Sequence, residues 1–490
     1  MTYDYDVIVL GGGGAGLAAA AQAGEQGAST LLLEAADELG GSTRMSAGVF
    51  YAAETTVQQA AGVADSVDRM FSYYMALNQW LVEPALARRF CVESAPTLEW
   101  LIKLGVEYPP DGLYRSGVDD TARGHQCTGG GAELVRTLAA GAAEGGAEIR
   151  CGVRVTELDT EGGAVHGVRV GESVIRAPAV VIATGGFGAN AELLAQYFPA
   201  PLAHGPRWTN YFGSPTSRGD GIAMTRGLGA EVCGTGFGML NWTAGFSDEP
   251  ADFCPSWIVF VNLDGHRFMA ENAPYAVAGD LIRAQRESRC FAILDEPARS
   301  SSADANARRD QLGVGEYTWG AETIRRQYEA GRVLRADTLP ALAGLAGIEP
   351  TALRNSIAEY NRDVRHGHDR RYLKPGELRE VATGPFYGVE VRASTFGNTF
   401  PGLRTDPDGR VYRADGGIIP GLFAAGEAAG GVMGPRYVGG GNSISNAVIF
   451  GRLAGAAAAR AGTGNDDGGK PGWLPSGQAG VRVEEAGVDD

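Results

Sequence analysis

Residues 5–10 (YDVIVL) run directly into residues 11–16 (GGGGAG), and this stretch decides the fold. The apolar run predicts a short buried strand, and the alanine-rich residues 17–27 that follow predict a helix. A second strand is expected over residues 29–33, and the acidic Glu34 follows it. Strand, glycine-rich turn, helix, strand and acid in this order indicate a dinucleotide-binding unit, in which Glu34 accepts the ribose hydroxyls.

Each position in the glycine-rich turn has an expected role. Gly11 permits the tight turn, Gly13 lets the backbone approach a pyrophosphate, and Gly16 lets helix and strand pack closely. Gly14 and Ala15 complete the turn just before the expected helix, whose free backbone N–H groups and dipole favour phosphate oxygens at its start. All five residues are therefore predicted to belong to the cofactor site.

The same turn accounts for part of an unusual composition. Glycine makes up 74 of the 490 residues, roughly twice its usual share. No three-residue glycine repeat is present and 44% of the residues are hydrophobic, so neither a collagen nor a low-complexity chain fits. The length predicts two or three lobes with a substantial buried core.

Charge and cysteine content exclude several classes of protein. The 42 basic and 58 acidic residues give a net charge of −16, which argues against nucleic acid or an anionic membrane as a main partner. The six cysteines are scattered without a CxxC or a metal-type cluster, and no run of 18 apolar residues occurs. No signal peptide is evident. These features predict a cytoplasmic protein with no metal site and no membrane span.

Three further segments favour FAD over NAD. Residues 35–48 (AADELGGSTRMSAG) form a second loop of small residues, which can contact the pyrophosphate and ribitol from the other side. Residues 179–183 (AVVIA) predict another buried strand, which TGGF closes at 184–187. Residues 421–427 (GLFAAGE) repeat the pattern of strand, glycine and acid. Glycine turns that are far apart in the sequence and converge on one extended ligand indicate FAD.

These motifs resemble the fumarate reductase and 3-ketosteroid dehydrogenase superfamily of FAD flavoproteins, nearest its ketosteroid branch. Further landmarks are HQCTGGG at 125–131, SRGDG at 217–221, GHRFMAENAPY at 265–275 and residues 426–452. The resemblance implies an α/β fold: a Rossmann-like, glutathione-reductase-type FAD-binding domain of residues 1–203 and 384–463, with an inserted α+β catalytic capping domain at 204–383. Residues 464–490, rich in glycine and acid, are expected to be a disordered tail.

The resemblance also implies which residues contact the FAD. Backbone near Val155 would meet the adenine. Attachment is expected to be non-covalent, because Arg44, Met45 and Ser46 stand where covalent relatives place a histidine. The other implied cofactor residues, besides those of the first glycine turn and Glu34, are Gly41, Ser42, Thr43, Gly48, Ala183, Thr184, Gly185, Asp220, Gly426, Glu427, Asn442, Ser443 and Ile444.

The branches of this superfamily differ in the groups that meet the substrate. Fumarate reductases hold two carboxylates with arginines and a histidine. In the corresponding stretch, residues 431–438 (GVMGPRYV), this chain keeps only Arg436, at a shifted position. A dicarboxylate would find too little positive charge there. Ketosteroid dehydrogenases carry tyrosines at both catalytic positions, and here those positions hold Tyr275 and Tyr437.

Dehydrogenation beside a ketone needs a base for the α-proton, flavin N5 for the β-hydride and donors to the carbonyl oxygen, which gains negative charge. The resemblance assigns Tyr275 as the base. It assigns Tyr437 and the backbone N–H of Gly441 as the donors. Tyr114, or else Tyr108, is a further candidate for a phenol that assists the base.

The substrate is left open between a 3-ketosteroid and a smaller cyclic ketone. The Δ4-(5α) dehydrogenases have a serine where this chain has Gly439, and the Δ1 subgroup has a longer cap and a different turn. Electrons are expected to pass to an external acceptor, because no haem or iron–sulfur motif is present. The alternatives are a fumarate-reductase-like enone or enoate reductase and a non-catalytic flavoprotein.

Overall fold

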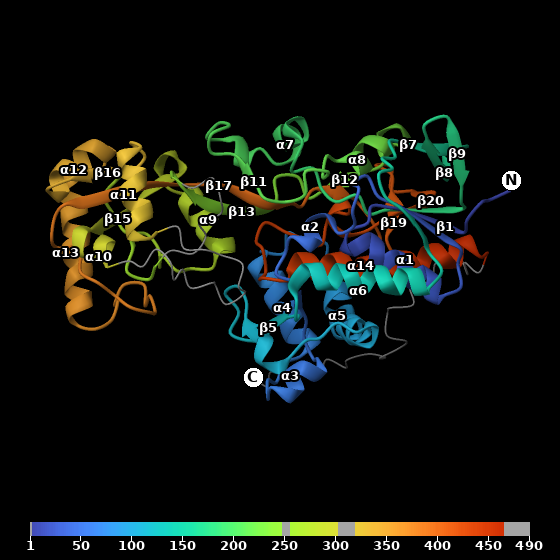
Figure 1. The fold of residues 1–490 in the computed structure, drawn as a ribbon, viewed down its shortest axis with the longest axis horizontal. Coiled ribbons are helices and arrows are strands. Elements are labelled where there is room, and N and C mark those ends of the chain that lie inside the picture. Colours follow the sequence, from blue (N-terminus) through green and yellow to red (C-terminus); the bar gives the residue numbers. More distant parts are fainter. Residues whose placement is uncertain (1, 247–254, 302–318, 465–490) are drawn as a thin grey trace, which may run out of the picture.

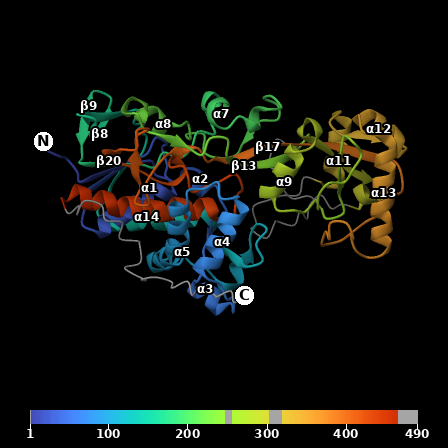
Figure 2. The ribbon, with the colours of Figure 1, turned by 180° about the vertical axis from the view of Figure 1, so that it is seen from behind.

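The computed structural model of the protein describes residues 2–246, 255–301 and 319–464, apart from the side chains of residues 275 and 276. The predicted disordered tail lies outside the described residues from position 465 onward. The described chain is elongated, with β1 (Val7–Leu10) towards one end of its long axis and α13 (Pro350–Arg365) at the other (Figure 1). The view from behind shows the same division (Figure 2).

The first sheet has the strand order β19–β20–β10–β1–β2–β6, and its strands run parallel except for the edge strand β19. Every residue of β1, β2 and β10 is buried, as expected for parallel strands covered on both faces. The other strands of this sheet are β2 (Thr30–Leu33), β6 (Glu148–Arg150), β10 (Ala179–Ile182), β19 (Arg410–Tyr412) and β20 (Ile418–Ala424).

Helices cover one face of this sheet and a small antiparallel sheet covers the other. α1 (Gly14–Glu25) packs against α6 (Gly130–Glu144) and α14 (Asn442–Gly462), and the three helices lie side by side in Figure 1. Val7 and Val9 belong to the core beneath these helices, whereas Ile8 and Leu10 pack towards the opposite sheet. That sheet consists of β7 (Glu157–Glu161), β8 (Ala164–Val170) and β9 (Ser173–Arg176). The Rossmann-like α/β fold predicted from the first glycine turn is therefore confirmed.

The second sheet is organised around the long strand β17 (Phe386–Thr399). β17 pairs antiparallel with three strands and parallel with the short β11, while β14 pairs with β15. These strands are β11 (Asn210–Tyr211), β13 (Gly238–Ala244), β14 (Val259–Asn262), β15 (Arg289–Asp295) and β16 (Leu334–Ala336). The accompanying helices are α9 (Tyr275–Arg283), α10 (Glu296–Ser300), α11 (Ala321–Glu329) and α12 (Leu339–Ala346).

The second sheet extends beyond the range predicted for the capping domain. β17 begins after the expected boundary at residue 384, yet it pairs along its length with strands of the second sheet. Its last residues, Asn398 and Thr399, reach the cavity described below. One continuous strand therefore links the two lobes, and the division into domains stays a prediction.

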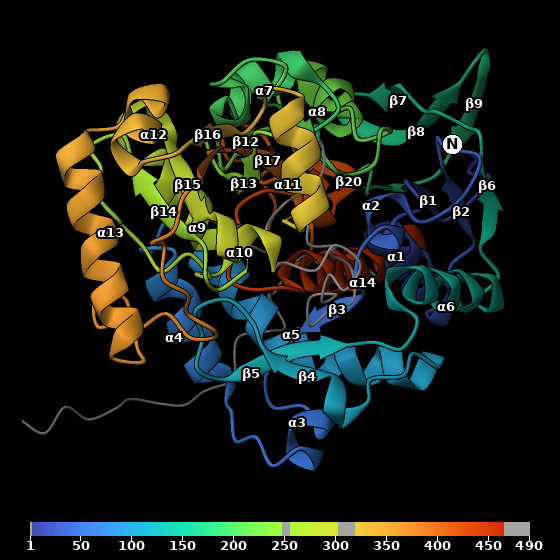
Figure 3. The same ribbon diagram turned by 60° about the vertical axis from the view of Figure 1, so that its left-hand side comes forward.

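A third group of elements lies beneath the first two, at the bottom of Figure 3. It comprises the small sheet β3–β5–β4 and three helices. Their bounds are β3 (Val49–Tyr51), β4 (Leu113–Arg115), β5 (Ala122–Gln126), α3 (Thr56–Ala60), α4 (Val67–Leu77) and α5 (Pro84–Leu104). Their buried side chains join the core under α1 and α14.

The remaining elements are short. They are α2 (Gly41–Arg44), α7 (Ala191–Tyr197), α8 (Asp220–Thr225), β12 (Val232–Cys233), β18 (Gly402–Leu403) and the 3-10 turns η1 (Pro110–Gly112), η2 (Ala200–Leu202), η3 (Arg226–Leu228), η4 (Arg286–Ser288) and η5 (Gly426–Ala428). Among the helices of the described residues, none combines the length and apolar character needed to span a bilayer.

Candidate cofactor and substrate site

A cavity opens where the parallel strands β1, β2 and β10 end, the edge at which open α/β sheets bind their ligands. Most of the residues predicted from the sequence line it, although they come from segments far apart in the chain. From the predicted set, the lining contains Gly11, Gly13, Gly14, Ala15, Glu34, Gly41, Ser42, Thr43, Val155, Ala183, Thr184, Gly185, Asp220, Glu427, Tyr437, Gly441, Ser443 and Ile444.

The helix α1 presents its uncapped N-terminus to this cavity. No side chain caps the helix at Gly13, and a Cβ built there would meet only the Gly40 carbonyl oxygen, at 3.8 Å. The space in front of Gly13 is therefore open. A Cβ on Gly16 would instead lie 1.8 Å from the Gly11 carbonyl oxygen, so glycine is required for the close packing of turn and helix. Open space at a helix N-terminus fits a diphosphate.

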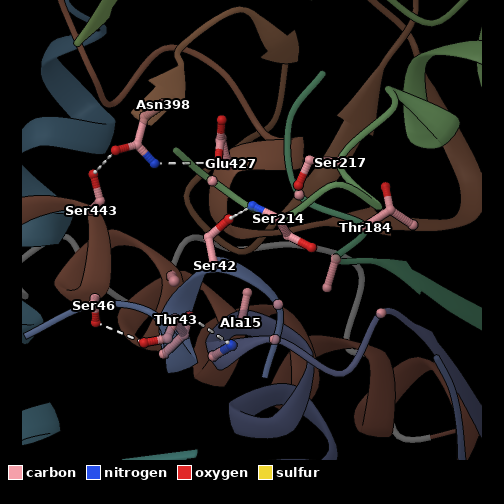
Figure 4. A pocket seen from close by; sticks show the side chains of 18 of the residues that line it. Ala15, Ser42, Thr43, Ser46, Thr184, Ser214, Ser217, Asn398, Glu427 and Ser443 are labelled. Carbon is pink, nitrogen blue, oxygen red and sulfur yellow. Dashed lines mark hydrogen bonds between the residues drawn. The ribbon is translucent and has the colours of Figure 1, made fainter. Parts of the chain in front are cut away.

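The second small-residue loop folds over this helix start. The Gly14 N–H donates to Thr43 Oγ1 at 3.1 Å, and the Ser214 N–H donates to Ser42 Oγ at 2.9 Å. Figure 4 shows Ser42 and Thr43 pointing to opposite sides of the short helix α2, between Ser214 and Ala15. The loop is thus held on both sides, by the first glycine turn and by the segment that follows β11.

Charged residues gather at the end of the cavity beyond β2. Glu34 is buried, and its carboxylate accepts the Gly12 N–H at 2.5 Å and the Ala36 N–H at 2.7 Å. Each carboxylate oxygen has a second lone pair, so Glu34 is oriented and can still accept ribose hydroxyls. Arg154 Nη2 donates to Asp220 Oδ1 at 2.8 Å on the neighbouring wall. This end of the cavity suits a ribose and an adenine.

One lining side chain has an unused hydrogen-bonding group. The Thr184 hydroxyl is buried and has no hydrogen-bond partner among the described residues, although it lines the cavity. Buried polar atoms in proteins are almost always paired. A ligand with polar atoms along its length, as FAD has, would satisfy this group. The open glycine turn, the helix N-terminus and the Thr184 hydroxyl all fit the cofactor.

A network of side chains lines the opposite end of the cavity. Glu427 Oε1 accepts from the Thr399 N–H at 2.7 Å and from the Thr399 hydroxyl at 2.9 Å. Asn398 Nδ2 donates to Glu427 Oε2 at 3.3 Å, and Asn398 Oδ1 accepts from the Ser443 hydroxyl at 3.2 Å (Figure 4). Burial raises the pKa of the Glu427 carboxyl, and these donated hydrogen bonds oppose that rise. The network joins β17, η5 and the start of α14.

Tyr437 lies next to this network and is 7% exposed. Its oxygen accepts the backbone N–H of Ser443 at 3.2 Å. Its ring lies nearly parallel to that of Phe400, with the centroids 6.4 Å apart. Burial raises the pKa of this phenol above its ordinary value, although hydrogen bonds from Ser443 and the Gly441 backbone act against the rise. Tyr437 therefore keeps its proton at neutral pH and is suited to donate a hydrogen bond.

The walls around Tyr437 are largely apolar. Met239, Phe400 and Met433 form a buried cluster with Tyr437, and Phe212 packs against it. Asn241 and Asn398 supply polar groups. Among the described residues that line the cavity, Arg154 at the far end is the one arginine, and no lysine or histidine occurs. This end is suited to an uncharged, largely apolar molecule.

Arg436 does not line the cavity, although it precedes Tyr437 in the chain. Its Nη1 lies 2.5 Å from Asp280 Oδ2 in helix α9, and its backbone N–H donates to Asn78 Oδ1 at 3.0 Å. Arg436, the one arginine that this chain shares with the fumarate reductase pattern in this stretch, is therefore paired with a carboxylate.

Four of the predicted cofactor residues lie behind the lining. Besides Gly16, these are Gly48, Gly426 and Asn442. A Cβ on Gly48 would lie 2.4 Å from the Gly130 carbonyl carbon, and one on Gly426 would lie 2.7 Å from the Ala15 Cβ. Asn442 is fully buried and donates to the Tyr74 hydroxyl at 3.3 Å. These residues shape the backbone around the cavity because neighbouring protein, rather than cavity space, fills their surroundings.

The three tyrosines proposed around the base have different positions. Tyr275 is the first residue of α9, and its side chain lies outside the described part of the structure. Tyr114, in β4, does not line the cavity, because its ring covers Gly124, where a Cβ would lie 2.7 Å from it. Tyr108 is buried against Phe50 in the core. The structure thus keeps both candidates for an assisting phenol away from the cavity.

His125 has a structural environment. It is 1% exposed, and its Nδ1 lies 2.8 Å from the Arg123 carbonyl oxygen, an acceptor that requires Nδ1–H. Its Nε2 lies 2.8 Å from Thr55 Oγ1, whose proton it can accept. Burial lowers the pKa of His125 to about 4. The neutral imidazole therefore connects β5 to Thr55, the residue that caps the N-terminus of α3.

Several lining residues were not identified from the sequence. They include Asn398 and Thr399 at the end of β17, and the apolar residues Met239, Phe400 and Met433. The Gly397-Asn398-Thr399 run, which ends β17, was a usable signal, because small polar residues at a strand end often face a ligand. The apolar residues form no motif, so the sequence offered no signal for them.

Comparisons with known proteins agree with this site. A family model described as FAD binding domain matches residues 6–444. The chain is 31% identical over 468 residues to a fumarate reductase (cytochrome) of Shewanella frigidimarina, covering 93% of this chain and 77% of that protein. It is 26% identical over 559 residues to a 3-oxosteroid 1-dehydrogenase of Mycobacterium tuberculosis, covering 92% and 97%.

A solved structure extends the likeness to the fold. The 3-ketosteroid-Δ4-(5α)-dehydrogenase of Rhodococcus jostii RHA1, in complex with 4-androstene-3,17-dione, matches with a TM-score of 0.76 and 26% identity, covering 94% of this chain and 98% of that one. The chain therefore belongs to the family of FAD-binding flavoproteins that includes fumarate reductases and 3-oxosteroid dehydrogenases, and it is an FAD-dependent oxidoreductase.

Proposed function

We propose that the protein is a dehydrogenase that introduces a C=C bond next to the carbonyl of a 3-ketosteroid or a smaller cyclic ketone. One observation carries the proposal: the substrate end of the cavity places the protonated phenol of Tyr437 among apolar side chains, with no cationic side chain in its described lining. An uncharged ketone can be bound there, whereas a dicarboxylate would lose its hydration without gaining a charged partner.

Tyr437 has the features of a donor to the carbonyl oxygen. Its raised pKa keeps the phenol protonated, and backbone N–H groups at the start of α14 support the phenolic oxygen. As the α-proton leaves, negative charge develops on the carbonyl oxygen, and a fixed donor stabilises that charge most where water is excluded. Gly441 supports this donor in two ways. Its backbone hydrogen-bonds to the Tyr437 oxygen, and the residue itself forms part of the cavity wall.

The second tyrosine has the complementary role in the proposal. Tyr275, at the N-terminus of α9, accepts the α-proton. A phenol can act as a base when its surroundings favour the phenolate, and the positive end of a helix dipole does so. When bound, FAD supplies the acceptor for the hydride that leaves the β-carbon, and an external acceptor then takes the electrons.

Anaerobic mixing of the oxidised holoenzyme with candidate ketones tests the proposal. A panel of ketosteroids and cyclohexanone derivatives is added, and flavin absorbance near its visible maximum is followed. At least one ketone should bleach the flavin, and the product should contain a new double bond beside the carbonyl. Bleaching by none of the ketones would refute the substrate class, and succinate serves as the dicarboxylate control that should leave the flavin oxidised.

The reverse direction is a second candidate, because the chain is 31% identical to a fumarate reductase. In that case the same residues would protonate the α-carbon of an uncharged enone, with electrons supplied by an external donor. Assays with a reduced dye should distinguish the two directions. Turnover of enones with fumarate left unreduced would favour an enone reductase, whereas rapid reduction of fumarate would contradict the argument from the missing cations.

A further inference from the structure

The two tyrosines of the proposed reaction belong to different parts of the molecule. Tyr437 lies on the loop between η5 and α14. Val432 and Val438 of this loop belong to the core of the first sheet, while the Tyr437 ring reaches across to Met239 of β13 and to Phe400. Tyr275 begins α9, which packs on β13 and β17 of the second sheet. Their relative position depends on contacts between the two lobes, because 162 residues (437 − 275) separate them along the chain.

Helix α9 is fitted closely to the wall of the cavity. A Cβ added to Gly279 would lie 2.0 Å from the Leu240 carbonyl oxygen, so the helix rests directly on β13. Met239 and Asn241, on either side of Leu240, line the substrate end. A small displacement of α9 relative to the Tyr437 loop would therefore change the geometry of the site itself.

A buried ion cluster anchors the segment that leads into α9. Arg267 pairs with Glu271 at 2.9 Å and with Asp369 at 2.8 Å, and Lys374 pairs with Glu271 at 2.8 Å. All four side chains are almost fully buried, and their formal charges balance. Burying four charges is costly unless their geometry is well defined. The start of α9 is thus held by the second sheet and its helices, so α9 moves with that lobe.

One ion pair crosses from α9 to the Tyr437 loop. Arg436 Nη1 lies 2.5 Å from Asp280 Oδ2, with the two side chains 30% and 16% exposed. Arg436 is adjacent to Tyr437, and its own N–H is held by Asn78 at 3.0 Å. Asp280 uses its other oxygen to accept from Arg283 in the same helix, at 2.8 Å. Both ends of the contact are therefore oriented by a second interaction.

We propose that Arg436 and Asp280 are positioning residues that set the placement of α9, and with it Tyr275, relative to Tyr437. The expected effect of this pair on catalysis rests on the function proposed above. The contact between Arg436 and Asp280 does not depend on which reaction the protein catalyses. Loss of either charge lets the lobes shift, and a shift of about 1 Å between reacting groups lowers rates by up to roughly 100-fold. The pair also keeps the Arg436 cation away from the substrate.

The test uses the holoenzyme with the ketone that bleaches its flavin. We expect Arg436→Gln and Asp280→Asn each to lower the rate of flavin reduction about tenfold or more, with FAD content and Tm unchanged. Arg436→Lys should retain most of the rate, and the exchanged pair Arg436→Asp with Asp280→Arg should recover part of it. Arg325→Gln is the matched control, because it removes an exposed arginine that pairs only with carboxylates of its own helix α11 and contacts neither Arg436 nor Asp280.

Ionic strength gives a readout that a purely structural role would not move. The wild-type rate should fall as salt is raised, because the pair is partly exposed and therefore screened, whereas the Arg436→Gln rate should be insensitive to salt. Rates of both single variants within twofold of the wild type, or equal salt dependence in the variant and the wild type, would overturn the proposal.

Hydrogen exchange separates this proposal from the proposed function. In Arg436→Gln and Asp280→Asn, amide exchange should quicken in both α9 and residues 432–441, while Arg325→Gln should leave both segments unchanged. Faster exchange in both segments supports the contact even if no ketone reduces the flavin, an outcome that would refute the function alone. Unchanged exchange in both single variants would refute the positioning role even if ketones are turned over.

Discussion

The two ends of the cavity are built in different ways. The end near α1 is lined by backbone groups and the Glu34 side chain from residues 10–47, together with residues 153–155, 183–185 and Asp220. At the end near Tyr437, side chains come from β13, from the end of β17, from the loop before α14 and from α14 itself. The first end is polar and draws most of its lining from one stretch of sequence, whereas the second is largely apolar and is assembled from several distant segments.

This difference follows from what each end binds. A diphosphate and a ribose are the same in every FAD, and backbone N–H groups at a helix start recognise them with little dependence on side-chain identity. A substrate is recognised by shape and by a few placed polar groups, which side chains must supply. Cofactor binding at the first end should therefore be lost when its open space is filled. Catalysis at the second end should be lost when single polar groups are removed.

The largest effect is expected from filling the open space at Gly13. In Gly13→Val the new Cβ has only the Gly40 carbonyl oxygen near it, at 3.8 Å, so the chain should fold, but the side chain occupies space that the diphosphate needs. FAD binding should weaken by about 100-fold or more, since overpacking of this kind costs roughly 3 kcal/mol. The flavin-to-protein absorbance ratio after dialysis measures this. Gly344→Val, an exposed position in α12 with open space around it, should retain FAD.

Removal of the Tyr437 hydroxyl should come next in size. Tyr437→Phe keeps the ring against Phe400 but removes the donor to the carbonyl, and the rate of flavin reduction should fall by roughly 100- to 1,000-fold. Stopped-flow absorbance under anaerobic conditions measures it, with FAD content as the check on binding. Tyr412→Phe, in the edge strand β19, is the control. A rate within threefold of the wild type would remove Tyr437 from the reaction.

A smaller effect is expected at Asn398, which connects two elements of the substrate end. Asn398→Leu has a similar shape but loses the hydrogen bonds to Glu427 and Ser443. The rate should fall about tenfold, because each buried group left unpaired costs roughly 1–3 kcal/mol and part of that cost is relieved by water. Ser443→Ala removes the donor to Asn398 Oδ1 and leaves the contact between Asn398 and Glu427, so it separates the two contributions. Equal rates in all three proteins would contradict the network.

The smallest effect on catalysis, and a distinct one on stability, is expected at His125. Its pKa is about 4 in the fold against an ordinary value of about 6.5, so between these values the unfolded chain binds a proton that the folded chain does not. The free energy of unfolding should therefore fall as pH drops from 7 to 4, by up to about 3 kcal/mol from this group. Urea unfolding across this range measures it.

A histidine variant isolates that contribution. His125→Gln should be less stable at pH 7, where the wild type benefits from the neutral imidazole, and should lose less stability on acidification. His368→Gln, at an exposed position, should follow the wild-type pH dependence. A His125→Gln profile parallel to that of the wild type would show that other groups cause the acid sensitivity.

Local segments of the fold were predictable within a few residues. The strand expected at residues 5–10 is β1 at Val7–Leu10, and the strand expected at 29–33 is β2 at Thr30–Leu33. The helix starts at Gly14 rather than residue 17, because Gly14, Ala15 and Gly16 already have helical backbone directly after the extended Gly13. Boundaries of this kind depend on the backbone of the turn, which side-chain periodicity does not report.

The amino-acid sequence by itself determined the cofactor end of this protein. Its information is local: a strand, a turn of glycines, a helix and an acid within 34 residues suffice to build a diphosphate site, because backbone geometry does the binding. Local pattern gave no such prediction for Tyr437, which was assigned only from the resemblance to a flavoprotein family.

Tertiary structure alone decided the substrate end. Asn398 meets Glu427 and Ser443, and Arg436 is paired with Asp280, because β17 and α9 bring together residues that are far apart in the chain. No periodicity or motif in the sequence predicts these contacts, since they depend on how whole elements pack. The packing of the lobes therefore determines the charge that a substrate would encounter. Arg436 precedes Tyr437 in the sequence, but its ion pair with Asp280 keeps its charge out of the cavity lining.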